Sequence, residues 1–533
     1  MRSEIRSNKR VTWFFAADGL LISAIVVSLY TLLMRQYPII YGGDTITRLV
    51  NPSRILNGHQ LPLLQTLIYL ALRIAYNPNT IFLLMAFISA AACLGFYALT
   101  YVLTGSRRAS WIVSILYATH PFILYYSRVP YQEPLLLAGM AWGFYYLFRP
   151  ASRVNRLLAS LFFAIACFSR YEGWIAALAA AIFELWRIRE RKGRAGFASL
   201  SATILRFGWA PAIWIVWNKD LSPAGSYVLD LGLQWSKLYR PYFISKSAIW
   251  WTPSVVVLLA LVGFAYSWLD SRMRKDPGFY VLLGTVALFM TVLIFSGHGI
   301  DPDPSRILTE REAFVPVAIL VLYGGIGANW LIGSIETYNK NLLFRFGFSL
   351  GILVMVVGYG LDSGFRRIAM ANADPDLKTD YEIARVLASR HSRGLVLAAP
   401  LPEEPMKNYL NSVERWSGLA GKRKAADLLK QAETTPLDYQ RILAYSWMGK
   451  DNVFPGDGLR GMDPPGVQSF LREKAVKFII VFSDFVPVAE HERSVLDCGV
   501  TGRSPELEIR NDGKVGRIYS VQFPPNAAGP NNP

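Results

Sequence analysis

The sequence predicts an α-helical polytopic membrane protein of about eleven transmembrane helices, followed by a small soluble α/β domain. Of its 533 residues, 53% are hydrophobic and only 17% are charged, which is too apolar for an ordinary globular protein. The 15 Trp, 27 Tyr and 30 Phe residues agree, because aromatic rings collect at membrane interfaces. This composition excludes a disordered chain, and three cysteines exclude a disulfide scaffold.

Long apolar stretches define a transmembrane domain over residues 1–361. Crossing the hydrocarbon layer takes about 20 residues. Eleven stretches are expected to cross it, at 13–34, 80–103, 109–127, 134–148, 157–169, 173–187, 197–217, 249–269, 278–296, 313–333 and 344–361. The first is too long for a cleavable signal peptide, and no small-residue cleavage site follows it.

Lysine and arginine residues predict the orientation in a cytoplasmic membrane. With the N-terminus in the cytoplasm, the six loops on that side hold 19 Lys and Arg against five acidic residues. These loops account for +14 of the total charge of +17, whereas residues 362–533 are nearly neutral. The C-terminal domain is then extracytoplasmic. Nucleic-acid binding is not expected, because it needs a basic face on a folded module.

This orientation places the loops 35–79, 218–248 and 297–312 outside. Within the first of them, the run LPLLQTLIYLALRIAY at 61–76 is helical and apolar. A twelfth span there would invert every later loop and move the basic stretch Arg187–Arg194 outside. We therefore expect an amphipathic helix that lies in the membrane interface.

Residues 362–522 predict a small α/β domain. The helical run DYEIARVLASRH at 380–391 precedes the β-like run GLVLAAP at 394–400. A second helix–strand pair lies at 469–484, and GRIYSV at 516–521 ends the fold. Strands that follow helices indicate a parallel sheet. No glycine-rich phosphate loop lies between strand and helix, so no nucleotide site is predicted. The Pro- and Asn-rich end, 523–533, is expected to be disordered.

Ionisable residues gather in the outer loops, where they are candidates for a functional site because charges at the ends of spans are costly. A carboxylate can act as general base on a hydroxyl, and Arg can hold a departing phosphate through two hydrogen bonds. The set therefore suits transfer of a group from a phosphate leaving group. Its members are Asp44, Arg48, Arg54, Arg128, Glu133, Arg170, Glu172, Arg306 and Arg311.

Several motifs connect these residues to a known family. Asp44 lies just outside the first span and is followed by RILNGHQLP at 54–62. Glu133 opens the fourth span, an Arg-x-Glu-Gly turn lies at 170–173, and TEREAFVPV lies at 309–317. In these features, roughly the first 360 residues resemble the GT-C superfamily of membrane glycosyltransferases. The nearest pattern is that of the protein O-mannosyltransferase and aminoarabinose-transferase type.

The resemblance implies an inverting transfer of a sugar from a polyprenyl-phosphate donor to an acceptor hydroxyl on the outer face. Asp44 would be the general base and Glu133 a second catalytic carboxylate. The donor and its phosphate would be bound by Arg48, Arg54, His59, Arg128, Arg170, Glu172, Arg306 and Arg311. The implied partners are the lipid-linked donor, membrane lipids and an acceptor that is a lipid, a glycan or a protein.

One departure concerns the acceptor. The mannosyltransferase type usually has two adjacent acidic residues in the first loop, whereas Asp44 is followed by Thr45. Protein mannosylation is therefore not the expected activity. The sequence leaves the donor sugar and a divalent metal requirement open.

Each candidate also has a structural interpretation. Asp44 can cap a helix at 45–57, and Glu133 before Pro134 can complement a helix dipole. The remaining charged residues can be ion-pair partners or anchors at lipid headgroups. This interpretation applies to Arg128, Arg170, Glu172, Arg306 and Arg311.

Two other functions stay open. A polysaccharide polymerase or ligase would also have many spans and outer arginines, but we would expect it to rely on a large outer loop. A non-enzymatic lipid or sugar transporter predicts inverted repeats and charges buried in mid-span, and neither is clear in this sequence.

Overall fold

The computed structural model describes residues 9–40, 43–50, 61–192, 197–217, 239–270, 273, 277–295, 313–338, 341–389, 395–398, 453–455, 463–484, 505–511 and 514–522. The chain divides into two compact units. The first comprises Met1–Gln36, Pro52–Ala75 and Asn79–Ile368, and the second comprises Tyr37–Asn51, Tyr76–Pro78 and Ala369–Pro533.

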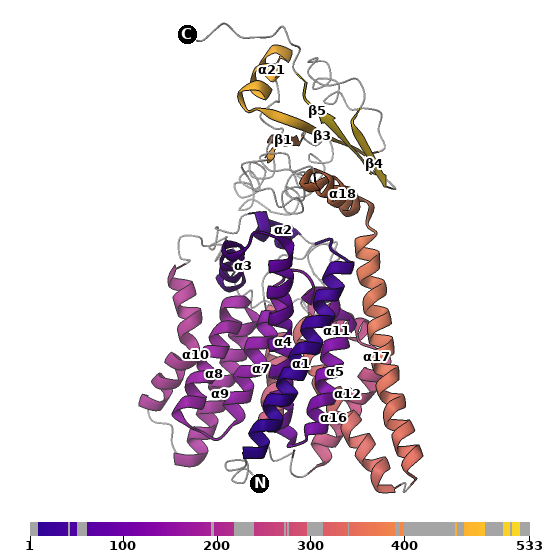
Figure 1. Ribbon diagram of the computed structural model, residues 1–533. Coiled ribbons are helices and arrows are strands. Elements are labelled where there is room, and N and C mark those ends of the chain that lie inside the picture. Colours follow the sequence, from indigo (N-terminus) through magenta and orange to yellow (C-terminus); the bar gives the residue numbers. More distant parts are fainter. Residues whose placement is uncertain are drawn as a thin grey trace. The chain divides into compact units, whose positions relative to one another are not determined.

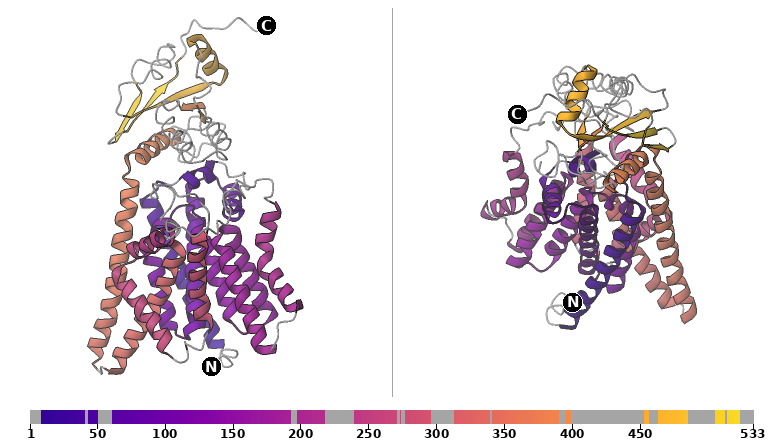
Figure 2. Two further views of the ribbon diagram at one scale, coloured as in Figure 1. Left: turned by 180° about the vertical axis from the view of Figure 1, so that it is seen from behind. Right: turned by 45° about the horizontal axis from the view of Figure 1, so that its top comes forward.

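The first unit is a helical bundle, shown from two sides in Figures 1 and 2. Every stretch that was expected to span the membrane contains a helix. These helices are α1 Lys9–Gln36, α4 Pro78–Thr104, α5 Arg107–Thr119, α7 Glu133–Phe148, α8 Arg153–Ser169, α9 Glu172–Lys192, α10 Phe197–Trp217, α12 Ser254–Leu269, α14 Pro277–Phe295, α16 Phe314–Tyr338 and α17 Leu342–Asn372.

The multi-span helical class is confirmed, and the number of spans stays a prediction. Among the described residues, five helices are long and apolar enough to cross a membrane, or six if one bent pair counts as a single span. Several of the others are short, such as α5 with 13 residues and α7 with 16.

Two of the expected spans are interrupted at a proline. The stretch 109–127 is divided between α5 and a short helix α6, Pro121–Ser127. Before α12 lies α11, Tyr239–Trp251, and the two helices bend by 112° at the break. Proline lacks an amide hydrogen and restricts the residue before it, so helices end there. The expected outer loop 218–248 is therefore helical from Tyr239 onward, and its place outside the membrane stays a prediction.

A single histidine connects the two breaks. The Nδ1 atom of His120 accepts a hydrogen bond from the amide of Phe122 at 3.2 Å, and so caps α6. Its Nε2 atom lies 3.1 Å from the hydroxyl of Thr252, which is in the break between α11 and α12. His120 therefore has a structural role in the bundle.

The run at 61–76 forms α3, Pro62–Ile74. Its 13 residues extend about 20 Å, which is too short to cross a hydrocarbon layer of about 30 Å. One face, with Leu64, Ile68 and Leu72, is buried, and α3 contacts α8. Its position in the membrane interface stays a prediction.

Glycines set the closest helix contacts of the first unit. An added Cβ at Gly327 of α16 would lie 2.0 Å from the carbonyl oxygen of Leu259 in α12. One at Gly263 of α12 would lie 2.0 Å from the carbonyl oxygen of Tyr323. Neighbouring Gly325 faces α5, where a Cβ would lie 3.0 Å from the amide nitrogen of Val113. Small residues of this kind let membrane helices approach closely.

Gly327→Ala is therefore expected to destabilise the protein by about 1–3 kcal/mol, because the new methyl group meets backbone rather than a movable side chain. Thermal unfolding of the purified protein in detergent measures the effect. The control is Gly284→Ala in α14, where an added Cβ would meet no atom within 4 Å beyond the neighbouring backbone of its own helix. Equal melting temperatures for the two variants would contradict the described packing.

Buried carboxylates of the bundle are paired with arginine. Asp18 in α1 is 3% exposed and receives two hydrogen bonds from Arg107, at 2.6 and 2.7 Å, and one from the Tyr97 hydroxyl at 2.5 Å. Glu184 in α9 contacts three guanidinium groups, those of Arg156, Arg187 and Arg206. An unpaired buried charge is costly. Some arginines of the expected cytoplasmic loops therefore also connect helices.

The second unit contains α2 Gly43–Val50 and a five-stranded sheet with two helices. These elements are α18 Pro375–Ser389, β1 Leu395–Ala398, β2 Val453–Pro455, α21 Pro464–Glu473, β3 Val476–Asp484, β4 Leu507–Asn511 and β5 Lys514–Ser520. The strand order is β2-β1-β3-β5-β4. Helix α18 packs on β4 and β5 and buries Ile383 and Leu387.

The prediction of a parallel sheet is wrong for half of this sheet. β1 is parallel to β2 and β3, but β5 is antiparallel to both β3 and β4. Only two residues separate β4 from β5, and a connection that short joins antiparallel strands. The sequence NDG at 511–513 is a hairpin signal for this turn. The expected disordered end, 523–533, lies outside the described residues.

Candidate active site

Three helix ends meet around Arg170 in the first unit. Helix α7 begins at Glu133, where Pro134 suits the first turn and a negative side chain complements the helix dipole. Helix α8 ends at Ser169, and the Arg170 amide donates to the carbonyl of Ala166 at 3.0 Å. Helix α9 begins two residues later, at Glu172.

Two glycines bring these ends together. An added Cβ at Gly139 of α7 would lie 2.6 Å from the Ala166 amide nitrogen. One at Gly173 of α9 would lie 2.3 Å from the Ala166 carbonyl oxygen. Helices α7 and α9 therefore both pack directly on the backbone of α8 at Ala166, one turn before Arg170. This close approach positions Glu133 and Glu172 on either side of the guanidinium group.

The Arg170 guanidinium bridges the two carboxylates. Its Nη1 atom lies 2.5 Å from Oε1 of Glu133, and its Nη2 atom lies 2.7 Å from Oε1 of Glu172. Its Nε atom is 3.0 Å from both carboxylate oxygens of Glu172. The side chains of Glu133, Glu172 and Arg170 are 1%, 12% and 16% exposed. These three predicted site residues are brought together, and their charges sum to −1.

Arg128 lies at the end of α6 and is buried. The ring of Tyr126, two residues earlier, packs on Tyr131, Trp251 and Phe314. Phe314 is the first residue of α16, so the start of α16 packs on α6. Arg311 precedes this helix by three residues in the sequence. Nearby, the Gln132 side chain donates to the carbonyl of Leu61 at 2.8 Å and so connects the starts of α7 and α3.

Asp44 and Arg48 belong to α2, in the second unit. The helix begins at Gly43, so Asp44 lies in its first turn rather than ahead of a helix that starts at 45. Arg48 is buried.

Solved structures resemble the chain over nearly its whole length. ArnT from Cupriavidus metallidurans bound to undecaprenyl phosphate aligns with a TM-score of 0.53 at 10% identity, covering 98% of this chain and 100% of ArnT. The chain therefore has a GT-C-like fold. The apo state of the same ArnT also aligns with a TM-score of 0.53, at 11% identity, over 94% of this chain and 98% of that one.

The other comparisons carry no further argument about the fold. The archaeal oligosaccharyltransferase AglB from Archaeoglobus fulgidus, in complex with an inhibitory peptide and a dolichol-phosphate, aligns with a TM-score of 0.46 at 12% identity, over 88% of this chain and 70% of AglB. No protein-family model and no curated protein sequence matches. At these identities the likeness concerns the fold alone.

Four of the predicted donor-binding residues lie outside the described residues, namely Arg54, His59, Arg306 and Arg311. Within the described ranges, no group of three or more His, Cys, Asp or Glu residues is placed to hold a metal ion.

Sequence reasoning missed Arg367, whose guanidinium carbon lies 3.7 Å from the ring centroid of Trp251. It adds a cation to the aromatic cluster beside Arg128. The adjacent arginines 366 and 367 after the last apolar stretch were the available signal.

Proposed function

We propose that the chain is a membrane glycosyltransferase that transfers a sugar from a polyprenyl-phosphate donor to an acceptor hydroxyl, with inversion, on the outer face of a cytoplasmic membrane. The observation that carries this proposal is the likeness in fold to ArnT over 98% of the chain, since that ArnT is bound to undecaprenyl phosphate. The acidic and basic residues at the ends of the spans support it.

In the proposed reaction, Asp44 is the general base. Its carboxylate takes the proton of the acceptor hydroxyl as that oxygen attacks the anomeric carbon of the sugar. The new glycosidic bond forms while the bond from the anomeric carbon to the phosphate oxygen breaks, and polyprenyl phosphate leaves. Attack from the face opposite the phosphate inverts the configuration. A positioned carboxylate of this kind contributes about 10²–10⁴-fold to the rate.

Charge divides the remaining candidates into two groups. The cluster of Glu133, Arg170 and Glu172 has a charge of −1, so it suits hydroxyl groups of the acceptor or sugar better than a phosphate. Phosphate would instead be held by the basic residues, where hydrogen bonds to a departing anion are strong. These are Arg48, Arg54, His59, Arg128, Arg306 and Arg311.

Sugar transfer itself tests the proposal. The purified full chain in lipid nanodiscs would be incubated with radiolabelled sugars on polyprenyl phosphate and with lipid, glycan or peptide acceptors, with and without a chelator. The expected result is one sugar transferred per acceptor and release of polyprenyl phosphate. Transfer of preassembled glycan chains would favour a ligase, and binding of donor without any consumption would favour a transporter. The chelator arm decides whether a divalent metal is required.

The proposed topology has eleven spans, a cytoplasmic N-terminus and an external C-terminal unit. Lys450→Cys in a Cys498→Ser background tests it, because the two other cysteines, Cys93 and Cys167, are buried. A membrane-impermeant maleimide is expected to label Cys at position 450 in intact cells. A Cys introduced at Ser271, in an expected cytoplasmic loop, should react only after permeabilisation. The reverse pattern would overturn the orientation.

A further inference from the structure

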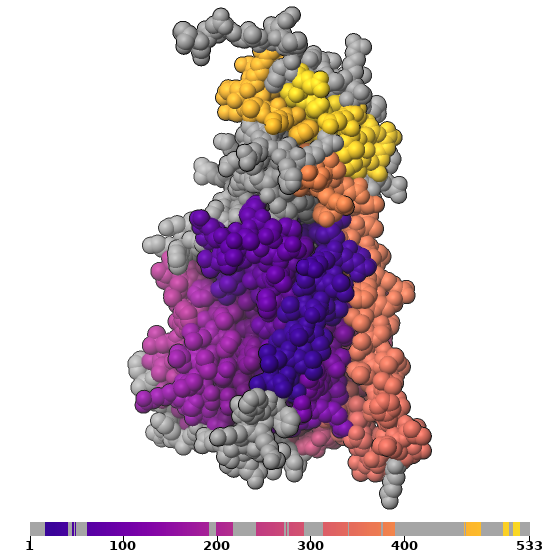
Figure 3. Space-filling model, in the orientation of Figure 1, coloured from indigo at the N-terminus to yellow at the C-terminus, as the bar shows by residue number. Residues whose placement is uncertain are grey.

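Helix α17 packs on the bundle through only one of its halves. Its buried residues are Val356, Gly360, Gly364 and Ile368, spaced four apart on one face. An added Cβ at Gly360 would lie 2.5 Å from the carbonyl oxygen of Thr119, at the end of α5. From 342 to 355, by contrast, no residue is buried. Figure 3 shows α17 as the orange column at the edge of the first unit.

A cavity of about 580 Å³ lies between this first half and helices α5, α12 and α16. That volume is in the range of pockets that hold ligands, about 300–1,000 Å³. Its walls are mostly apolar and include Ile112, Leu116, Leu259, Ile332, Phe346 and Leu353. Water has too few polar partners in such a space, and the surrounding medium of a spanning helix is lipid. An acyl chain is therefore the natural occupant.

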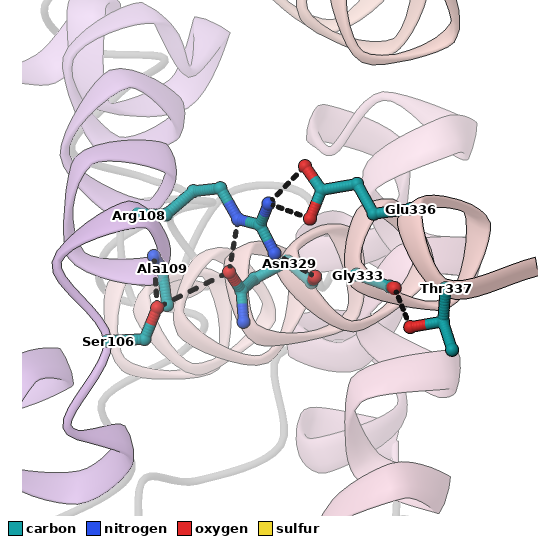
Figure 4. A network of polar contacts seen from close by, with 7 residues as sticks. All are labelled: Ser106, Arg108, Ala109, Asn329, Gly333, Glu336 and Thr337. Carbon is teal, nitrogen blue, oxygen red and sulfur yellow. Dashed lines mark hydrogen bonds and ion pairs between the residues drawn. The ribbon is translucent and has the colours of Figure 1, made fainter. Parts of the chain in front are cut away.

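One end of the cavity is charged. Arg108 lies at the start of α5, and its Nη1 atom is 2.6 and 2.7 Å from the two carboxylate oxygens of Glu336 in α16. Figure 4 shows this ion pair from close by. The Nε atom of Arg108 also donates to Asn329 Oδ1 at 2.9 Å. Arg345, near the start of α17, lines the same cavity. The three charged lining residues sum to +1, so this end suits an anionic headgroup.

This groove is separate from the candidate active site. Helix α5 starts at Arg107 beside the groove, and α6 continues the chain to Arg128 at the other end of the bundle. Because α7 starts beyond Arg128, Glu133 also lies at that other end. The groove opens on the leaflet that the basic loops assign to the cytoplasm.

We propose that the groove between the first half of α17 and helices α5, α12 and α16 binds an anionic glycerophospholipid. One acyl chain would lie along the apolar wall of α17, and the phosphate would lie at Arg345. The lipid would fill the space that separates α17 from the bundle and so hold α17 in place.

Native mass spectrometry of the full chain in mild detergent tests this proposal. The probes are phosphatidylglycerol, phosphatidylcholine, polyprenyl phosphate and inorganic phosphate. The wild type is expected to retain phosphatidylglycerol about fivefold more strongly than phosphatidylcholine. One basic side chain near an anionic headgroup adds about 1 kcal/mol of binding free energy, which corresponds to that ratio. Ser349→Trp, which fills the groove, should remove most of the bound lipid. Val354→Trp is the control, since that side chain on the same helix is 59% exposed and does not line the cavity.

Arg345→Gln is expected to abolish the preference for phosphatidylglycerol, whereas Arg366→Gln, at an exposed position of the same helix, should keep it. Comparing Arg345→Gln with Arg366→Gln tests the proposed headgroup site even if Ser349→Trp fails to fold. Equal lipid retention by Ser349→Trp and Val354→Trp would overturn the proposal. So would displacement of the bound phosphatidylglycerol by inorganic phosphate, or by polyprenyl phosphate, which the proposed function assigns to the other end of the bundle.

Discussion

Asp44→Asn is expected to lower sugar transfer by about 10²–10⁴-fold and to leave the protein folded. The amide has nearly the shape of the carboxylate but cannot accept the proton of the acceptor hydroxyl. The loss should appear in kcat, because a general base acts in the transition state and contributes little to binding of the ground state. Steady-state kinetics with saturating polyprenyl-phosphate sugar measure it, and binding of polyprenyl phosphate to the variant shows that the donor site is intact.

The matched control is Asp362→Asn, the same chemical change at an exposed residue of α17 that is paired with Arg366. It should keep wild-type activity. Glu133→Gln separates the two catalytic candidates. If Asp44→Asn retained full activity and Glu133→Gln lost it, Glu133 would be the base and the assignment to Asp44 would be wrong.

Arg170→Met is expected to destabilise the protein by about 3–5 kcal/mol, the cost of breaking a buried ion pair. The change removes the guanidinium that contacts both Glu133 and Glu172, of which Glu133 is 1% exposed. Thermal unfolding in detergent, followed by tryptophan fluorescence, measures the loss. Because Arg170 is in the candidate site, sugar transfer should fall with it.

Two further variants make this prediction specific. Arg366→Met removes an exposed ion pair with Asp362 and should cost no more than about 1 kcal/mol. Adding Glu133→Gln to Arg170→Met removes one buried charge and should recover part of the stability. If Arg170→Met unfolded at the same temperature as Arg366→Met, the three side chains would not form the described cluster.

Hydropathy was a good guide to the helical bundle, because the energetic cost of an exposed backbone in lipid makes apolar length a direct signal. It failed where prolines interrupt a helix, as at Pro121 and Pro253, since the apolar stretch continues across the break. In the second unit, the sequence predicted β1, β3 and β5, but it missed β2 and β4 and the direction of the strands. Direction depended on the hairpin between β4 and β5, whose turn signal at 511–513 is short.

Local spacing likewise predicted only part of the candidate site. Arg170 and Glu172 are two residues apart, and their ion pair was foreseen as a structural possibility. Glu133 is 37 positions from Arg170, and no local sequence pattern predicts their contact. It depends on Gly139 and Gly173, which let α7 and α9 reach the backbone of Ala166. The predicted donor-binding roles of four further residues rest on the family resemblance alone; these residues are Arg54, His59, Arg306 and Arg311.

The amino-acid order alone predicted a multi-span helical chain and a GT-C-like pattern, because burial in lipid acts on each segment separately. The orientation predicted by loop charge rests on the sequence alone. Only the folded structure shows which charged side chains form ion pairs with one another. Arg108 and Glu336 are 228 positions apart, and the groove that they border exists because α17 leaves the bundle over half its length. Such contacts depend on how helix surfaces fit together, a property that no single segment possesses.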